Sequence, residues 1–492
     1  MKIIFRFARY FLLCAIALQS CTASRDAKPL PDAASRLSDS LSRRRVLLPN
    51  GWSLTPAGRT VPLRSDLPLN LAVSPSKKLI ATTNNGNGRQ SITLIDIATE
   101  KVLDDVEIAK SWVGLAFGGD EQFLYASGGN DNTVVIYKID SGKLLRDSVI
   151  TLGASGAPWP KEKISPGGIA IDSKRHLLYV CTKEDSSLYT CDLASRRTVR
   201  KLKLSAEPYT AVLSPDAATL YISLWGGDQV LCYDVATQKI IAAVPTENHP
   251  NDMTLTADGS RLFVANANSN SVSIIDTPSK KVIETVSAAL YPAAPTGSTT
   301  NGLALSPDER TLYVANADNN CLAVFDVSRA GESRSQGFIP VGWYPAAVRV
   351  VGSKIFVANG KGTASLPNPK GPQPDRKSGN TDEYIGRLFK GSLSIIDAPD
   401  ARTLALYSKL VYDNTPYSKS REVTASGEAG NPVPREAKTA NALSPIKYVF
   451  YVIKENRTYD QMLGDVKEGN GDSSLCLFPE PITPNHHALA RE

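Results

Sequence analysis

A carboxylate and an amide stand next to each other near the C-terminus, at Glu455 and Asn456. They follow residues 446–453 (IKYVFYVI), a nearly unbroken apolar run that is typical of a strand buried on both faces of a parallel sheet. Ligand groups of open α/β sheets gather just beyond the carboxyl ends of strands, and hard oxygen ligands suit a divalent cation. The pair would suit a divalent cation, although by itself a carboxylate and an amide after a strand are usually a solvated turn. Residues 458–461 could open a helix behind the pair.

A second reactive position lies near the N-terminus, at Cys21. Basic residues precede the apolar residues 11–18, a run too short to span a bilayer, as in a secretory signal peptide. The tetrapeptide Leu-Gln-Ser-Cys that follows resembles the bacterial lipobox, in which the cysteine is diacylated, and an incidental cysteine after a plain signal is the alternative. We expect residues 1–21 to be the signal peptide and residues 22–45 to be a flexible tether. The protein is then exported and lipid-anchored on the periplasmic side of the envelope or the cell surface, and Thr22 after the cysteine favours the outer membrane.

The composition excludes several other chemistries. Only His176 and His249 of the four histidines lie in the central part of the chain, so neither a histidine metal site nor a catalytic triad is expected there. The sequence has no Walker loop and no GxSxG motif. The net charge of +6 is modest for 492 residues, and no basic run alternates with aromatic residues, so we expect no nucleic-acid partner. Cys181 and Cys191 could pair as a disulfide or remain small buried thiols.

Internal repetition identifies the elements that must position these residues. A strand such as LYVAN, a polar turn and a strand such as SVSIID recur along the chain, and each copy closes on an aspartate. The closing aspartates are Asp96, Asp140, Asp192, Asp234, Asp276, Asp326 and Asp397, at intervals of 44, 52, 42, 42, 50 and 71 residues. The shorter intervals fit four short strands with their turns, which make up one propeller blade. The repeats therefore predict an all-β, seven-bladed β-propeller over residues 46–412, with no cofactor of its own.

The repeats resemble the YVTN/YncE-like propeller family, whose Tyr-Val-Thr-Asn strand appears here as Tyr/Phe-Val-Ala-Asn over roughly residues 60–410. The resemblance implies a fold that many exported and surface proteins share, with varied roles. We expect each closing aspartate to begin a tight turn, and the repeated Asn266 and Asn316 to occupy turns with unusual dihedral angles. Residues 59–63 are predicted to complete the last blade as an outer strand, beside a strand near residues 403–407.

Three long insertions are predicted to lie on one face of the propeller. The blade strands run antiparallel, so the connections between blades and those between the second and third strands of a blade emerge on the same side. The insertions at residues 153–168, 287–301 and 360–391 are all of these two kinds. The same face is expected to carry Trp112, Trp159, Tyr209, Trp225, His249, Tyr291, Trp343 and Tyr344. Exposed aromatic residues on rigidly supported loops favour a binding surface, although such loops could also simply cover the channel and pack on themselves.

The C-terminal segment resembles a second family. The stretch IKYVFYVIKENRTYDQMLGD is similar to the start of the phosphoesterase family within the alkaline-phosphatase superfamily, which includes phospholipase C-like and acid phosphatase enzymes. The resemblance implies that Glu455 and Asn456 bind the active-site metal ion of a complete domain. The nucleophile and the other ligands of such a site come from later segments, and a doubly wound sheet needs more chain than residues 445–492 provide. We therefore expect an incomplete, inactive α/β segment after a linker over residues 413–444.

Three classes of function remain open. The first is an exported protein in which the propeller is joined to a metal-dependent phosphoesterase with a phosphoester substrate. The second is a pure binding module whose insertion-bearing face engages an envelope protein or a glycan. The third, an enzyme at the channel mouth, is the least favoured, because no cluster of acids, bases or metal ligands stands out. We expect a monomer held at the membrane by its lipid alone, since no later apolar run is long enough to span a bilayer.

Overall fold

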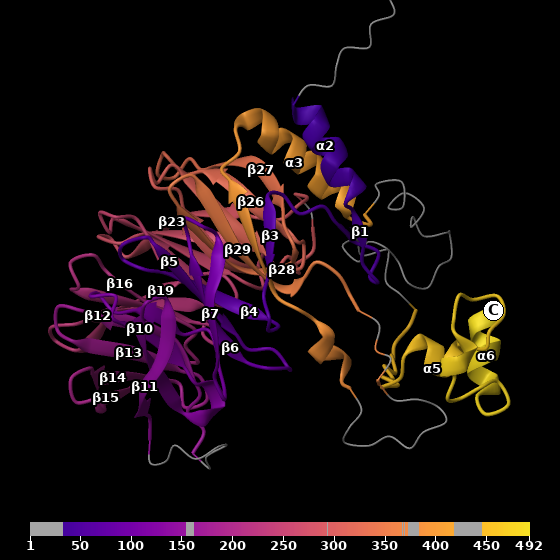
Figure 1. The fold of residues 1–492 in the computed structure, drawn as a ribbon, viewed down its shortest axis with the longest axis horizontal. Coiled ribbons are helices and arrows are strands. Elements are labelled where there is room, and N and C mark those ends of the chain that lie inside the picture. The colour runs from indigo at the N-terminus through magenta and orange to yellow at the C-terminus, as the bar shows by residue number, and fades with distance from the viewer. Residues whose placement is uncertain are drawn as a thin grey trace, which may run out of the picture.

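Seven four-stranded sheets form the body of the molecule. The computed structural model describes residues 33–153, 162–292, 294–366, 368, 370–371, 383–417 and 445–492. Each sheet is one blade, whose antiparallel strands follow one another from the axis outward, and the blades stand around a central axis (Figure 1). The predicted seven-bladed β-propeller is therefore confirmed.

The blades are numbered here in chain order, and their strands have the following bounds. Blade 1 contains β4 (Pro68–Val73), β5 (Leu79–Asn84), β6 (Ser91–Asp96) and β7 (Lys101–Glu107), and blade 2 contains β8 (Leu115–Phe117), β9 (Phe123–Ser127), β10 (Thr133–Asp140) and β11 (Lys143–Thr151). Blade 3 contains β12 (Pro166–Asp172), β13 (Leu177–Thr182), β14 (Ser187–Asp192) and β15 (Arg197–Lys203). Blade 4 contains β16 (Ala211–Leu213), β17 (Thr219–Leu224), β18 (Gln229–Asp234) and β19 (Lys239–Pro245). Blade 5 contains β20 (Pro250–Leu255), β21 (Arg261–Asn266), β22 (Ser271–Asp276) and β23 (Lys281–Ser287), and blade 6 contains β24 (Thr300–Leu305), β25 (Thr311–Asn316), β26 (Cys321–Asp326) and β27 (Arg334–Pro340). Blade 7 contains β28 (Trp343–Val351), β29 (Lys354–Gly362), β30 (Ser392–Asp397) and β3 (Arg59–Pro62). Short 3-10 turns, η1 (Gly129–Asp131) and η2 (Ile385–Leu388), interrupt loops of blades 2 and 7.

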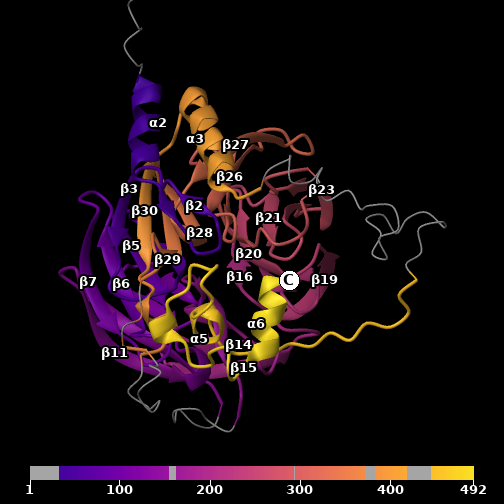
Figure 2. The same cartoon turned by 90° about the vertical axis from the view of Figure 1, so that its right-hand side faces the viewer.

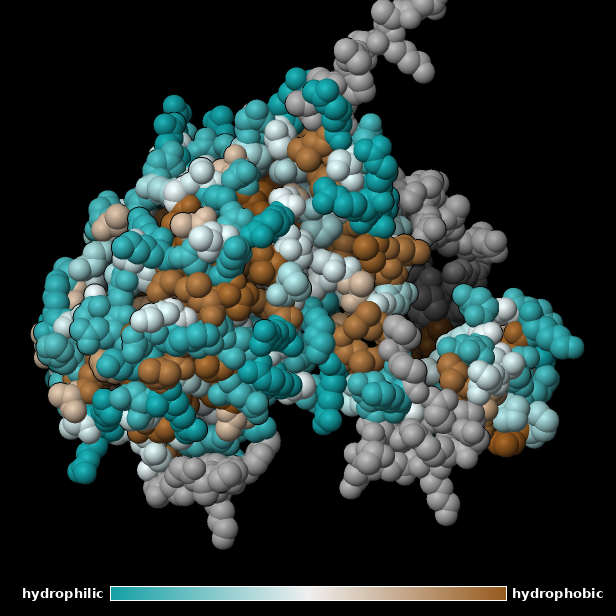
Figure 3. All heavy atoms as spheres, in the orientation of Figure 1, coloured by the Kyte–Doolittle hydropathy of each residue, from teal (hydrophilic) through white to brown (hydrophobic). Residues whose placement is uncertain are grey.

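A hydrophobic core lies between each pair of neighbouring blades. In blade 5, Val264 and Ile275 pack against blade 4, whereas Phe263 and Ile274 pack against blade 6. The seven core clusters among the described residues follow this pattern around the ring. The middle strands are apolar at successive positions because both of their faces are buried. The outermost strand β23 instead alternates between exposed residues and residues that are half-buried or, at Val286, buried. Outer strands leave hydrophobic patches on a mainly hydrophilic surface (Figure 3).

The two cysteines that the sequence left open as a disulfide are free thiols. Cys181 and Cys191 lie on opposite faces of blade 3, in two different hydrophobic clusters. Burial raises the pKa of Cys181 to about 12 and that of Cys191 to about 11, so both stay protonated. They fill space in the core and are not reactive groups.

The ring closes through a strand that precedes the first blade in sequence. β3 pairs with β30 as the outermost strand of blade 7, with Val61 opposite Leu393, which confirms the prediction for residues 59–63. The predicted strand near residues 403–407 is wrong, because this segment belongs to helix α3 (Ala401–Asn414). The buried residues of α3 recur at a helical period, at Leu404, Tyr407, Leu410, Val411 and Asn414.

Helix α3 covers the outer edge of blade 6, where it packs on β27 (Figure 1). Ser408 Oγ accepts a hydrogen bond from the backbone nitrogen of Phe338 on β27, at 2.8 Å. The neighbouring Gly337 makes room for this approach, since a Cβ there would lie 2.3 Å from Ser408 Oγ. The helix thereby protects a strand edge that would otherwise offer unpaired backbone groups to another chain.

The N-terminal described segment is also helical. α2 (Ala33–Arg43) packs beside α3 (Figure 2), and Leu41 is buried in the core between blades 6 and 7. The flexible tether predicted for residues 22–45 is therefore wrong from residue 33 onward, because the leucines of α2 find an apolar partner in α3. A small hairpin of β1 (Val46–Leu47) and β2 (Ser53–Leu54) follows. Cys21 lies outside the described residues, within which no helix has the length and apolarity to cross a membrane.

The closing aspartates of blades 1 to 6 begin turns, as predicted, whereas Asp397 of blade 7 leads through residues 398–400 into helix α3. Each is the last residue of the third strand of its blade. Asp96 Oδ1 accepts a hydrogen bond from the backbone nitrogen of Thr99 at 2.7 Å, and Asp234 does the same for Thr237 at 2.6 Å. The hydroxyl groups of Thr99 and Thr237 also donate to these oxygens, each at 2.6 Å. The hydroxyl bonds first, and the backbone bonds after them, lower the pKa of both carboxyl groups, as expected for an aspartate that caps its own turn.

The repeated asparagines do not occupy turns, so that prediction is wrong. Asn266 is the last residue of β21 and is buried, and its Nδ2 donates to Ser271 Oγ at 3.0 Å and to Ser273 Oγ at 2.9 Å on the neighbouring strand. Asn316 has the same place in β25, and its Nδ2 donates to the carbonyl oxygen of residue 288 at 2.7 Å. The left-handed backbone falls instead on Asn270, with φ of 53°.

Residues 445–492 form a small helical unit with α5 (Tyr459–Leu463), η3 (Ser473–Leu475) and α6 (Pro484–Arg491). The predicted helix start is confirmed by a capping box between Thr458 and Gln461. The predicted strand over residues 446–453 does not form, and Phe450 is 92% exposed. A lone strand requires a neighbour for its backbone groups, and the described chain offers none here. The described residues 445–492 therefore contain helices but no strand, and the structure does not show the α/β fold predicted for this segment.

Candidate ligand cavity on the insertion face

The connections between blades and the connections between second and third strands open on one face, which we call the insertion face. The strand order confirms that the three long insertions emerge there, after β11, β23 and β29. Parts of these insertions, including Trp159 within residues 154–161, lie outside the described residues.

A cavity of about 620 Å³ opens on the insertion face between blades 1, 2 and 3. Its walls come from residues 85–90 and residues 107–112, together with residues 129–130 and residues 183–184. The lining carries amide, hydroxyl, charged and backbone groups around the indole of Trp112. Small-molecule sites in proteins commonly have this volume and are commonly built from loops on a rigid scaffold.

Asp66 holds the loop of residues 85–90 in shape. Asp66 is 4% exposed, and its Oδ2 accepts hydrogen bonds from the backbone nitrogens of Asn87 at 2.9 Å and Gly88 at 3.4 Å. Gly86 lies so close that a Cβ there would be 2.0 Å from the same oxygen, which explains the glycine. One wall of the cavity is therefore organised by the protein itself.

The second wall is tied to the first and carries the aromatic group. Gln90 Oε1 accepts a hydrogen bond from the backbone nitrogen of Ser111 at 2.7 Å, which joins the two loops. Next to it, Trp112 is partly exposed, and the Lys183 ammonium lies 5.4 Å from the centre of its ring. This cation–π contact holds the indole at the edge of the cavity.

A second cavity of about 390 Å³ adjoins the first, because residues 85–87 line both. Its other wall comes from blade 7, where Lys361 lies 5.5 Å from the ring centre of Trp343 and 4.6 Å from that of Tyr344. Trp343 also meets Phe389 edge-to-face at 5.4 Å. The structure thus brings two of the predicted residues together beside a cation that the sequence analysis did not single out.

Other predicted aromatic residues form separate groups. Trp225 and His249 meet edge-to-face with their ring centres 4.1 Å apart. Tyr291 packs against Tyr412 and Tyr417 near the end of α3, at 5.7 Å and 4.3 Å between ring centres. The predicted set is therefore spread over the insertion face and partly packs on its own loops, instead of forming one continuous patch.

Tyr209 lines a narrower cavity of about 120 Å³ on the propeller axis, and burial raises its pKa. Arg349 crosses this channel from blade 7. Its guanidinium lies 3.4 Å from Asp252 Oδ2 of blade 5 and donates to Asn70 Oδ1 of blade 1 at 3.1 Å. These groups satisfy one another, which is the arrangement of a structural ion pair and not of an acid and a base poised to react.

The predicted metal ligands do not gather with further ligands. Glu455 and Asn456 lie in the exposed stretch before α5. Among the residues that the structure describes, no group of three or more histidine, cysteine, aspartate or glutamate side chains could hold a metal ion. Two oxygen ligands fall short of the coordination sphere of a divalent cation, so the described residues do not fit a metal ion by themselves.

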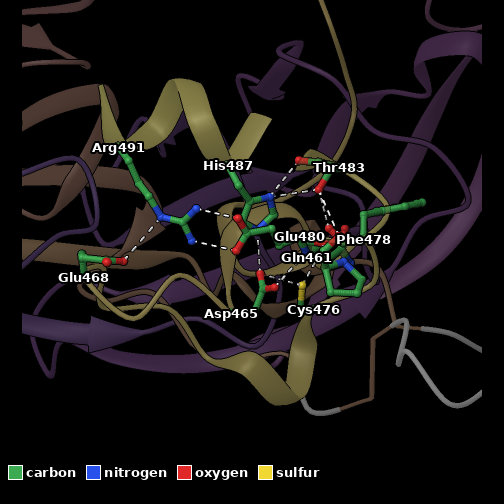
Figure 4. Close-up of polar contacts among 10 residues, drawn as sticks. Gln461, Asp465, Glu468, Cys476, Phe478, Glu480, Thr483, His487 and Arg491 are labelled. Carbon is green, nitrogen blue, oxygen red and sulfur yellow. Dashed lines mark hydrogen bonds and ion pairs between the residues drawn. The ribbon is translucent and has the colours of Figure 1, made fainter. Parts of the chain in front are cut away.

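A cluster around Asp465 joins α6 to the loop after α5 (Figure 4). His487 Nε2 lies 2.9 Å from Asp465 Oδ1, and Cys476 Sγ donates to the same oxygen at 3.4 Å. The hydrogen bond from His487 holds the pKa of Asp465 well below its usual range, and the pKa of His487 is raised in turn. Burial raises the pKa of Cys476, so its thiol is not an activated nucleophile.

Comparison with known proteins concerns the propeller. The sequence profile of YncE-like β-propellers matches residues 36–329. Among solved structures, hydrazine synthase of Kuenenia stuttgartiensis is similar with a TM-score of 0.51 and 19% identity, over 61% of this chain and 94% of that chain. U3-55K is similar with a TM-score of 0.53 and 13% identity, over 68% of this chain and 98% of that chain. Identities this low show a shared fold alone, and curated protein sequences gave no match. Because the profile spans more than half of the chain, the protein belongs to the YncE-like β-propeller family.

Proposed function

We propose that this protein is an exported binding module whose insertion face engages an envelope component, a protein or a glycan. The observation that carries the proposal is the cavity of about 620 Å³ on that face, whose loop walls are held by Asp66 and Gln90. A propeller is a rigid scaffold, and its function resides in the sites on its loops. The lipid on Cys21 would hold the module at the membrane, and the lipobox-like sequence supports this part of the proposal.

The proposal is tested by blocking the cavity with a bulky side chain. Ala109 is exposed and lines the cavity, so Ala109→Trp fills space without touching the core. Ala236 is exposed in a turn between third and fourth strands, on the opposite face, so Ala236→Trp is the matched control. We expect purified wild-type protein and the control to sediment with envelope fragments of the source cell, and Ala109→Trp to lose most of this binding. No sedimentation of wild-type protein, or equal sedimentation of both variants, would overturn the proposal.

A second candidate function is a metal-dependent phosphoesterase of which residues 445–492 are the opening part. Its support is the Glu-Asn-Arg motif together with helix α5, which is capped by Thr458 and lies where the sequence predicts a helix to open. Further support is the exposure of residues 446–453, because such an apolar run is normally covered by other strands. In this case Glu455 and Asn456 contribute to a metal site that residues beyond this segment complete.

Two measurements separate this second function from the first. The intact mass of the native protein, extracted from source membranes with detergent, should lie well above the 52.9 kDa of this chain if a larger domain follows. The purified 492-residue chain should not hydrolyse a nitrophenyl phosphate ester in the presence of divalent metal ions. A native mass near that of this chain would contradict the second function, and metal-dependent turnover by this chain would contradict the expectation that residues 445–492 are inactive by themselves.

A further inference from the structure

We propose that the cavity of about 390 Å³ between blades 1 and 7 binds a small organic acid, whose carboxylate meets the Lys361 ammonium and whose apolar body packs on Tyr384 and Phe389. The inference goes beyond the proposed function, because it assigns a ligand to the cavity beside the one on which that proposal rests. The volume lies in the lower part of the range of small-molecule sites, which is about 300–1,000 Å³.

Lys361 gives this cavity a positive charge that the protein does not neutralise. It is the one cation among the described residues of the lining, and no described carboxylate pairs with it. Its ammonium lies over the rings of Trp343 and Tyr344, and such contacts hold an ammonium in place but leave its N–H donors unpaired. At the larger cavity, in contrast, Arg89 is paired with Asp105. An anion at the smaller cavity therefore competes with no carboxylate of the described chain for Lys361.

Asp66 also lines the cavity, but its carboxylate is engaged by the protein. The residue is 4% exposed, and its Oδ2 accepts hydrogen bonds from the backbone nitrogens of Asn87 and Gly88. These donors stabilise its negative charge, and it makes no ion pair with Lys361. Asp66 therefore shapes the loop, while Lys361 remains the charged group that is open to a ligand.

The other walls of the cavity are largely apolar. Tyr384 is 56% exposed and Phe389 is half-buried, so both rings have surface free for a ligand. Gly360 keeps the space beside them open, because a Cβ there would lie 2.9 Å from Leu67 Cδ1 and 3.1 Å from Tyr344 Cδ1. An inorganic anion could use Lys361 but not these walls, and a neutral apolar molecule could use the walls but not Lys361. The two features together specify an acid with an apolar body.

The test compares three probes, phenylacetate, phenylacetamide and acetate, in ligand-observed NMR titrations of the purified full chain. We expect phenylacetate to bind. The other two probes should bind roughly tenfold more weakly or less, because phenylacetamide lacks the charge that Lys361 pairs with and acetate lacks the apolar body.

Three variants assign the binding to this cavity. Lys361→Met removes the charge but keeps an unbranched side chain, so it should bind phenylacetate and phenylacetamide alike. Lys390→Met makes the same change of charge at an exposed lysine of the neighbouring loop that does not line the cavity, and it should keep the wild-type preference. Tyr384→Ala should weaken the binding of both aromatic probes. Thermal denaturation of each variant checks that it is folded.

Several outcomes would overturn the inference. These are a failure of phenylacetate to bind the wild type, equal binding of phenylacetate and phenylacetamide by the wild type, a preference that survives in Lys361→Met, and an equal loss of preference in Lys390→Met. None of them changes the result expected for Ala109→Trp in sedimentation with envelope fragments. The organic-acid site and the proposed function can therefore fail independently.

Discussion

At the scale of single residues, the role of a side chain was predictable where its hydrogen-bond partners lie close to it in the sequence. The closing aspartates were recognised as turn residues because an aspartate bonds the backbone two or three positions ahead, as Asp96 does. The role of Asn266 was missed, since its partners Ser271 and Ser273 lie on the next strand and are specified only when the strands pair.

The buried amide of Asn266 should contribute measurably to stability. Asn266→Ala removes two hydrogen bonds to the neighbouring strand and leaves two buried serine hydroxyls with one partner fewer. We expect a loss of about 1–3 kcal/mol in the free energy of unfolding, measured by urea denaturation. Asn268 is exposed in the following turn, and Asn268→Ala should cost under about 0.5 kcal/mol. Equal losses in both variants would contradict the structural role of Asn266.

The C-terminal unit should loosen as the pH rises. His487 is buried, with Thr483 O 2.9 Å from Nδ1 and Asp465 Oδ1 2.9 Å from Nε2, and only the doubly protonated ring donates to both. The pKa of His487 is raised chiefly by Asp465, so its contribution is fully present below the ordinary histidine pKa of about 6.5 and is lost as the pH rises through the raised folded value. Glu480 and Arg491, which are paired with each other, face the same cluster.

Proteolysis measures this pH dependence. Cleavage within residues 445–492 by a protease active across the range should be faster at pH 9 than at pH 6, relative to an unstructured peptide substrate. His487→Asn should remove most of the difference, whereas His486→Asn, a change at a half-buried neighbour that does not contact Asp465, should retain it. Identical pH dependence in both variants would show that His487 does not hold the unit together.

At the scale of elements, prediction succeeded where a pattern repeats and failed where an element depends on a partner. The middle strands of the blades were predictable because seven copies share one template. α3 was mistaken for a strand, although the spacing of Leu404, Tyr407 and Leu410 and the Asp400 cap at its start were visible in the sequence. Residues 446–453 have the composition of a buried strand, but composition does not supply the neighbouring strand that a sheet needs.

The packing of α3 on blade 6 should stabilise the propeller. Leu410 is 1% exposed in the core between blades 6 and 7, so Leu410→Ala should lower the free energy of unfolding by about 2–4 kcal/mol. Lys409 lies on the exposed side of the same helix and pairs with Asp413 one turn away, so Lys409→Ala should cost under about 0.5 kcal/mol. A comparable, small effect of both substitutions in thermal denaturation would mean that the helix is not part of the cooperative unit.

At the scale of the whole molecule, closure of the ring was predictable but the cavity was not. Residues 59–63 were recognised as the closing strand because they read as an outer strand that precedes the first inner strand, and closure of a ring needs strands from both ends of the propeller. The cavity, in contrast, is assembled from loops of three blades whose mutual distances the repeat pattern does not specify. The same holds for Arg349, which meets Asp252 and Asn70 across the axis although they are far apart in sequence.

The ion pair on the axis should matter to the whole ring. Arg349→Met leaves Asp252 without its cation in a partly buried channel, so we expect a loss of about 1–3 kcal/mol in urea denaturation. The double variant Arg349→Met, Asp252→Asn should recover part of this loss, because it removes the unpaired charge. Arg334→Met, on the exposed outer strand of blade 6, is the control and should have little effect. No difference between Arg349→Met and the control would show that the pair does not tie the blades together.

The central claim, that the insertion face of the propeller is its binding surface, is tested most directly by hydrogen–deuterium exchange of the full chain with and without solubilised envelope fragments of the source cell. The account predicts that residues 85–90 and 107–112, the two loops that wall the cavity, become protected, while the turns on the opposite face are unchanged. Protection confined to those opposite turns, or to residues 445–492, would contradict it and place the binding surface elsewhere on the molecule.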